Sequence, residues 1–183
     1  NKCIHGLPGV SFVLHRKEDL PRIKNIPSRS VYLDLIGHLK AQEKGDSLFT
    51  PAVQAHYALD AALDELLEET VSGRIKRYRE AAENLRKGFK DIGLEFLIPE
   101  DQRSNCLTAL KIPNGISYDW LHDKLKENGF IIYAGQGLFN RKIFRIANMG
   151  NIQDEEFALC LKILKECFAR FKKPSNGKIY DSI

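Results

Sequence analysis

The sequence feature that most constrains the fold is a stripe of apolar residues between positions 75 and 92. Six apolar side chains recur there at intervals of 3, 4, 3, 4 and 3 residues, the spacing of one helix face: Ile75, Tyr78, Ala82, Leu85, Phe89 and Ile92. Gly93 follows directly and predicts the end of this helix. Because such a face is stable only against a neighbour, the stripe predicts a core built on this helix.

Strands and helices alternate in the second half of the chain. Short apolar runs between turn residues predict strands at 94–98, 106–112, 130–133 and 143–147. Ser117 is placed to cap one intervening helix, and the acidic residues 154–156 predict the start of another that ends near residue 173. This order predicts an α/β fold, a small sandwich in which helices cover one side of a mostly antiparallel sheet.

Two further helices are predicted upstream of the stripe. Residues 32–43 show weak helical spacing, and Thr50 and Pro51 have the residue types preferred at a helix cap and at the first helical position. The helix that starts there is predicted to run to Ser72-Gly73, with one apolar face: Leu59, Ala62, Leu63, Leu66 and Leu67.

The chain begins with a lysine beside a restricted turn. Lys2 precedes Gly6, Pro8 and Gly9, and residues 10–14 form an apolar run that predicts a mostly buried strand. A lysine amine is a usable nucleophile only when burial or a cationic neighbour lowers its pKa, so a rigid support would matter. Spacing alone also fits a solvated surface lysine, which is the commoner case.

Composition excludes several classes of function. Hydrophobic residues make up 43% and charged residues 28% of the 183 residues, as in soluble globular proteins, and the net charge of +4 includes no long basic run typical of a nucleic-acid arm. No apolar stretch is long enough to span a membrane. The four cysteines and five histidines lack metal-ligand spacing, which predicts reduced thiols, no metal site and a cytoplasmic protein.

Four segments together resemble a known enzyme family. The pattern Asn-Lys-Cys-x-x-Gly-x-Pro-Gly-x-x-Phe-Val at the start, and residues 28–35, 49–51 and 144–150 further on, resemble class V aminotransferases, which are fold-type I pyridoxal phosphate enzymes. Within that class they most resemble the aminotransferases that use 2-aminoethylphosphonate and pyruvate. The resemblance runs from residue 1 to about 168 and covers only the C-terminal half of such an enzyme. The chain, which has no initiator methionine, is therefore expected to be a fragment that is inactive alone.

The resemblance also implies a domain division. Residues 1–48 would be a remnant of the large cofactor-binding domain, residues 49–173 the C-terminal small domain, and residues 174–183 a flexible tail. The family's glycine-rich phosphate loop, its stacking aromatic residue and the aspartate at the ring nitrogen belong to the upstream half and are not in this chain. Family members are homodimers whose active site is shared between subunits.

The resemblance gives Lys2 and Thr50 roles toward the cofactor. Lys2 would be the Schiff-base lysine of pyridoxal 5'-phosphate and would afterwards carry the substrate proton, because the cofactor supplies the electron sink and the protein a positioned amine. Thr50 would contact the cofactor phosphate across the dimer interface. That role is compatible with its predicted place at a helix N-terminus, where free N–H groups favour anions.

Substrate binding is assigned by the same resemblance to Arg145, Arg29 and Ser28. Strand alternation places Arg145 on the face opposite Phe144 and Ile146, where its guanidinium could hold a carboxylate or phosphonate through two parallel hydrogen bonds. From spacing alone, Arg145 could equally extend into solvent. Ser28 and Arg29 would lie in a loop at the active-site mouth, where plain solvation is the alternative.

Three functions remain open at this stage. The first is half of an aminotransferase that moves an amino group from 2-aminoethylphosphonate to pyruvate. The second is another class V enzyme, acting on alanine, serine or glyoxylate, or a desulfurase; residues 133–136 depart from the phosphonate-enzyme pattern, and Cys3 and Cys106 are poorly placed for a desulfurase. The third is a non-catalytic domain for dimerisation or partner binding.

Overall fold

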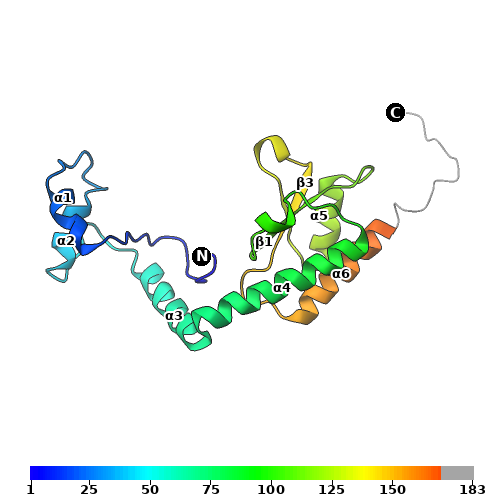
Figure 1. Cartoon of the computed structure of the whole chain (residues 1–183), viewed down its shortest axis with the longest axis horizontal. Coiled ribbons are helices and arrows are strands. Elements are labelled where there is room, and N and C mark those ends of the chain that lie inside the picture. Colours follow the sequence, from blue (N-terminus) through cyan, green and yellow to red (C-terminus); the bar gives the residue numbers. More distant parts are fainter. Residues whose placement is uncertain (170–183) are drawn as a thin grey trace. The chain divides into compact units, whose positions relative to one another are not determined.

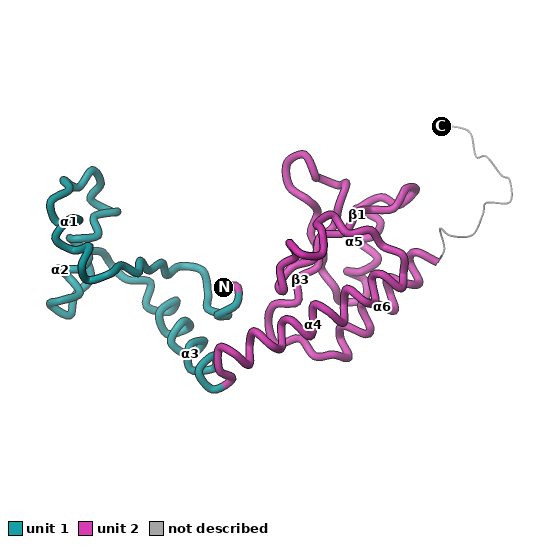
Figure 2. The backbone as a smooth tube through the Cα atoms, viewed as in Figure 1, with its two compact units in different colours: residues 1, 3–68 teal, residues 2, 69–183 magenta. Residues whose placement is uncertain are grey.

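The structure is a computed structural model that describes residues 1–169. The chain divides into two compact units (Figure 2): the first comprises Asn1 and the residues from Cys3 to Glu68, and the second comprises Lys2 and the residues from Glu69 onward. The predicted domain division after residue 48 is a separate proposal, and the tail predicted at 174–183 lies outside the described residues.

The first unit is helical. It contains the short 3-10 helix η1 (Lys17–Asp19) and the α-helices α1 (Leu20–Lys24), α2 (Leu35–Gln42) and α3 (Val53–Glu69), whose last residue belongs to the second unit. Asp34 caps α2, because its side chain accepts a hydrogen bond from Ile36 N at 3.1 Å. The weak helical spacing at 32–43 is thereby confirmed as a helix.

The buried strand predicted at residues 10–14 is wrong. This segment has no assigned secondary structure, and the side chains of Phe12, Val13 and Leu14 are 62%, 59% and 87% exposed. A strand needs a neighbour to take its backbone hydrogen bonds, and no segment in the described part of the chain pairs with this one. The apolar run has the composition of a buried strand, but the sequence pattern does not show whether a neighbouring strand is available to pair with it.

The predicted start of α3 is displaced by two residues. The first helical carbonyl acceptor is Ala52 O, which accepts from His56 N at 3.1 Å, so Ala52 and not Thr50 occupies the cap position. The predicted apolar face of α3 is only partly covered: Ala62 is buried, whereas Leu63 and Leu67 are exposed.

The second unit is a small α/β sandwich, which confirms the predicted fold class (Figure 1). Its antiparallel sheet has the strand order β1-β3-β2, formed by β1 (Leu107–Lys111), β3 (Ile143–Ala147) and β2 (Tyr133–Ala134). Its helices are α4 (Val71–Ile92), α5 (Tyr118–Glu127) and α6 (Asp154–Ala169), with the 3-10 turns η2 (Glu100–Gln102) and η3 (Gly137–Phe139) between them. The strand predicted at 94–98 is reduced to a single bridge between Phe96 and Leu110. Of the strand predicted at 130–133, only Tyr133 lies in β2.

The ends of α4 and α5 follow local signals in the sequence. Gly93 ends α4 in the left-handed conformation, with φ 85°, as predicted. The start of α4 differs from the prediction: the break falls at Thr70, whose hydroxyl accepts from Gly73 N at 3.0 Å, so Gly73 lies inside the helix. Ser117 caps α5 as predicted, because its hydroxyl accepts from Trp120 N at 3.2 Å.

The core of the second unit is built on the predicted stripe of α4. Every stripe residue from Tyr78 to Ile92 is buried, and only Ile75, near the start of the helix, is half exposed. Three residues of the stripe, Leu85, Phe89 and Ile92, pack in one cluster with residues of α6 and of one sheet face: Cys160, Leu164, Phe168, Leu110, Phe144 and Ile146. Burial raises the pKa of the Cys160 thiol to about 11, so this thiol stays protonated, as expected of a core cysteine.

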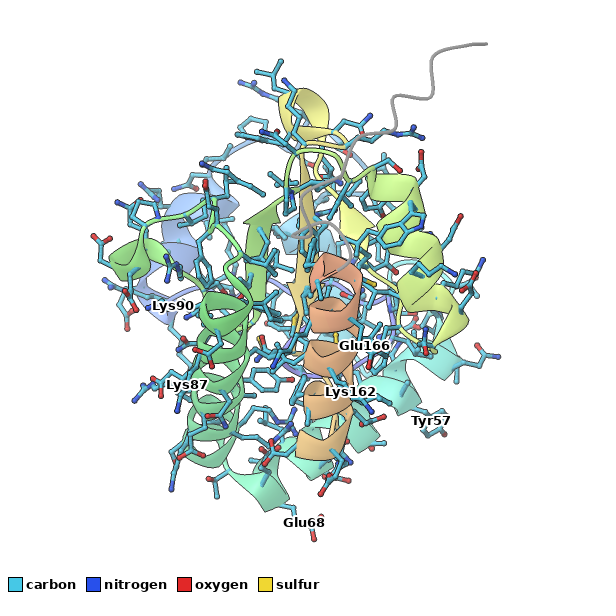
Figure 3. All side chains as sticks on the ribbon, turned by 90° about the vertical axis from the view of Figure 1, so that its right-hand side faces the viewer. Tyr57, Glu68, Lys87, Lys90, Lys162 and Glu166 are labelled. Carbon is cyan, nitrogen blue, oxygen red and sulfur yellow. The ribbon has the colours of Figure 1, made fainter. Side chains whose placement is uncertain are left out.

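A glycine allows α4 and α6 to lie side by side (Figure 3). A Cβ atom added to Gly88 of α4 would lie 2.4 Å from Leu161 Cδ1 of α6, which is closer than two carbon atoms can approach without a steric clash. Gly88 therefore fits this helix contact because it has no side chain, although glycine is a poor helix former.

We expect Gly88→Val to destabilise the second unit by about 1–3 kcal/mol, because the added methyl groups overfill the α4–α6 contact. Lys87→Val, at the exposed neighbouring position of the same helix, is the matched control and should change the unfolding free energy by less than about 1 kcal/mol. Urea unfolding of the two variants measures the difference. Equal unfolding free energies would mean that the helices do not meet at Gly88.

Candidate active site

Arg145 lies on the central strand of the sheet, in a row of three residues. It pairs with Ala109 of β1 on one side and with Tyr133 of β2 on the other. Its neighbours Phe144 and Ile146 point into the helix-covered core and are buried, so Arg145 belongs to the opposite sheet face, as alternation predicted. Arg145 is half buried there, between a small side chain and a phenol that is 63% exposed.

The guanidinium of Arg145 is held by one nitrogen and free at the other two. Its Nε donates to Ala134 O at 2.9 Å. Neither terminal nitrogen has a hydrogen-bond partner among residues 1–169. The strand thus fixes the plane of the guanidinium and leaves a pair of N–H donors, the arrangement that binds a carboxylate or phosphonate through two parallel bonds.

Tyr118 adds a neutral phenol near this site. Its hydroxyl donates to Ile132 O at 3.0 Å, so α5 is tied to the residue just before β2. Burial raises the pKa of Tyr118, and the positive charge of Arg145 opposes that rise with a smaller effect. A phenol with a raised pKa stays protonated and does not compete as an anion for the Arg145 guanidinium.

The segment that follows β3 is anchored to α4. Asn148 is 2% exposed, and its Nδ2 donates to Tyr78 O at 3.1 Å and to Asn105 O at 2.9 Å. Gly150 N donates to the Tyr78 hydroxyl at 3.0 Å, and Arg77 Nη1 donates to Gly150 O at 2.8 Å. This structural role of residues 148–150 was not predicted from the sequence. A polar residue directly after an apolar strand was the available signal.

Lys2 precedes a loop that is packed on α3. The backbone of Gly6 is buried, and a Cβ atom there would lie 3.4 Å from Leu59 Cδ1. Gly9 has φ +132°, and a Cβ atom there would lie 3.2 Å from the Cβ of Ala55. His5 adds a hydrogen bond, with its Nδ1 3.3 Å from Glu65 Oε1. The loop after Lys2 is thus fixed by glycines, as the turn pattern suggested, while Lys2 itself is exposed.

Ser28, Arg29 and Thr50 are exposed residues of the first unit. The Ser28 hydroxyl donates to Ser30 O at 2.8 Å, so it supports its own turn. Thr50 lies two residues ahead of the cap position of α3. Arg145 belongs to the second unit, and the substrate and cofactor roles of these three residues remain predictions.

The comparisons with known proteins bear on this arrangement. No protein-family model matches the chain. A 2-aminoethylphosphonate–pyruvate transaminase from Bacteroides fragilis is 34% identical over 170 residues, which make up 91% of this chain and 46% of that protein. The transaminase of the same name from Syntrophobacter fumaroxidans is 35% identical over 176 residues, 93% of this chain and 47% of that protein. The chain spans about half the length of these relatives.

Solved structures show the same relationship. The ureidoglycine–glyoxylate aminotransferase of Bacillus subtilis has a TM-score of 0.73 and 28% identity over 84% of this chain and 40% of that one. The subgroup IV aspartate aminotransferase of Thermus thermophilus has a TM-score of 0.71 and 27% identity over 81% of this chain and 42% of that one. This chain belongs to the class V aminotransferase family. The resemblance drawn from the four sequence segments is thereby confirmed.

The residues of this class V chain fit part of a pyridoxal phosphate site. The exposed Lys2 offers a primary amine, the group that attaches to an aldehyde, and the exposed hydroxyl of Thr50 offers a donor to a phosphate. Among the described residues, no three metal-ligating side chains come together, and no helix has the length and apolar character needed to cross a membrane.

A carboxylate at the end of α3, two residues before α4 begins, supports the anchored segment of this aminotransferase chain. Glu69 accepts from Arg77 Nε at 2.7 Å and from Arg77 Nη2 at 3.1 Å, and it also accepts from Nε of the buried Arg74. These bonds, those from Arg77 above all, lower the pKa of Glu69 from 4.5 to about 2. Arg77 also donates to Gly150 O. Glu69 therefore positions the arginine that anchors Gly150, the last residue of the segment that follows β3.

We expect Glu69→Gln to reduce the unfolding free energy by about 1–3 kcal/mol at neutral pH, the scale of a lost charged hydrogen bond. The folded-state pKa is depressed, so the stabilisation is complete above pH 4.5 and is lost as the pH falls toward about 2. The gap between wild type and variant should therefore close over that range in denaturant unfolding. Glu80→Gln, in an exposed ion pair with Lys76, is the control with little effect; a gap that does not change with pH would contradict this role of Glu69.

Proposed function

We propose that this chain is the C-terminal half of a pyridoxal-phosphate-dependent aminotransferase that transfers the amino group of 2-aminoethylphosphonate to pyruvate, giving phosphonoacetaldehyde and alanine. The observation that carries the proposal is the Arg145 guanidinium, held at Nε by Ala134 O with two terminal nitrogens free on the open sheet face. The names of the relatives from Bacteroides fragilis and Syntrophobacter fumaroxidans support the choice of donor and acceptor.

Arg145 suits both half-reactions of such a transfer. The donor ends in a phosphonate and the acceptor in a carboxylate, and a guanidinium fork binds either group through two oxygens. Ala109, paired with Arg145, leaves room beside it, and Tyr133 on the other side offers a phenol. One anion site can therefore hold donor and acceptor in turn.

Lys2 and Thr50 would serve the cofactor. When bound, pyridoxal phosphate supplies the electron sink that makes the substrate's carbon-bound proton removable. The Lys2 amine would hold the cofactor before substrate arrives and would then take up the substrate's carbon-bound proton. The Thr50 hydroxyl would donate to the phosphate from the partner subunit of a homodimer, and Ser28 and Arg29 would contact the acid group or the phosphate.

A second candidate is an aminotransferase that uses glyoxylate with alanine or serine. It is favoured by residues 133–136, which depart from the phosphonate-enzyme pattern beside the Arg145 site, and by the likeness to the Bacillus subtilis glyoxylate enzyme. Both candidates use Arg145 for an acid group, so substrate preference separates them.

The test is a kinetic comparison of wild type, Arg145→Lys and Arg141→Lys in the full-length protein that carries this chain. Arg145→Lys keeps the charge and loses the paired bonds, so kcat/KM should fall roughly ten- to a hundredfold for donor and acceptor alike. Arg141, exposed on the same hairpin and paired with Asp119, is the matched control and should leave the rates unchanged. The preferred pair should be 2-aminoethylphosphonate with pyruvate.

Two outcomes would change the assignment. Faster turnover of alanine or serine with glyoxylate would favour the second candidate. Unchanged kinetics in Arg145→Lys would remove Arg145 from the site and with it the observation on which the proposal stands.

A further inference from the structure

A cluster of charged side chains gathers where α4 meets the loop that leads to β1. Arg86 and Lys90 lie on α4, Glu100 lies in η2, and Arg103 is the residue that follows η2. These four residues, called here the Arg86–Arg103 cluster, take no part in the function proposed above. Arg86 contacts Thr108, on the helix-covered sheet face, whereas Arg145 lies on the other face.

Arg103 is fixed in place and carries an unsatisfied donor. Its Nε donates to Ile98 O at 2.8 Å, and its Cζ lies 4.0 Å from the centre of the Phe96 ring. The side chain is only 11% exposed. Within residues 1–169, Arg103 Nη1 is the one buried side-chain nitrogen or oxygen without a hydrogen-bond partner. A buried charged N–H group without an acceptor is costly, so this donor points to a missing anion.

Arg86 is held close to Arg103 by neutral groups. Its Nη2 donates to Ser104 O, and its Nε donates to Thr108 Oγ1 at 3.4 Å. Burial, and after it the charge of Arg103, lower the pKa of Arg86. Neutral groups thus hold both guanidiniums: a carbonyl and a hydroxyl bind Arg86, and the Ile98 carbonyl binds Arg103. None of these groups cancels the positive charge.

The carboxylates nearby do not complete the cluster. Glu100 binds Lys90 Nζ with both oxygens, at 3.1 and 3.4 Å, and its Oε1 is 3.9 Å from Arg103 Nη1, too far for a hydrogen bond. Glu100 is 75% exposed and so stands at the rim. Glu83 is the other carboxylate whose charge acts on Arg86. Lys87 adds a cation on the same side of α4 as Lys90, away from α6 (Figure 3).

We propose that the Arg86–Arg103 cluster binds a tetrahedral oxyanion of the phosphate class, with the free N–H groups of both arginines as donors. Planar guanidinium forks match the oxygens of a phosphate group, and both forks are already oriented by protein carbonyls, so little side-chain entropy is lost on binding. Glu100, exposed and bound to Lys90, turns outward to admit the anion. The inference does not depend on the aminotransferase proposal.

The deciding experiment is a titration of the 183-residue chain with inorganic phosphate, using chloride at equal ionic strength as the reference. Thermal unfolding reports protection, and calorimetry reports affinity. Phosphate should raise the unfolding midpoint of the wild type, and Glu100→Gln should bind phosphate about fivefold more tightly because one repelling charge is gone. Arg86→Gln and Arg103→Gln should lose the protection. Arg79→Gln, at an exposed position of the same helix, should keep it.

Other outcomes overturn the proposal. If Glu100 is itself the intended partner of Arg103, Glu100→Gln will be less stable in chloride and will gain no affinity for phosphate. Loss of the phosphate effect in Arg145→Gln would place the anion at Arg145 and not at this cluster. A second titration with glycerol phosphate identifies the source of the ligand: tighter binding than inorganic phosphate indicates an organic phosphate ester, and weaker binding indicates the free ion.

Discussion

The packing of α4 against α6 and one sheet face is the interaction on which the second unit depends. Leu85 and Phe89 from α4 meet Leu164 from α6 and Phe144 from the sheet, all at most 2% exposed. Burying several large side chains of this kind contributes about 1.5–3 kcal/mol each. Because this contact covers one face of the sheet, it also determines that Arg145 lies on the opposite face.

Polar contacts then set the position of β3. Asn148 and Gly150, just after β3, bind to Tyr78 on α4, so α4 and β3 are joined at one end. At the middle of β3, the bond from Arg145 Nε to Ala134 O orients the guanidinium. The apolar core thus positions the sheet, and the hydrogen bond to Ala134 O orients the guanidinium of Arg145. A fixed direction is what a paired interaction with an acid group requires.

Local signals predicted those elements whose stability is local. The apolar stripe predicted α4, Gly93 and Ser117 predicted helix ends, and alternation placed Arg145 on the correct sheet face. The strand predicted at 10–14 failed because pairing depends on a neighbour that a linear pattern does not contain. The bond from Arg145 to Ala134 could not be predicted either, since it depends on the register between β2 and β3. The unsatisfied Arg103 donor depends in the same way on how a loop folds back.

The central claim is that this class V chain carries the cofactor lysine at Lys2 beside a fold that presents Arg145. The most direct measurement is borohydride reduction of the full-length protein loaded with pyridoxal phosphate, followed by peptide mapping. The account predicts one stable label, on Lys2, and its loss in Lys2→Arg. A label on any other lysine, or no stable label in a protein that is otherwise folded, would contradict it.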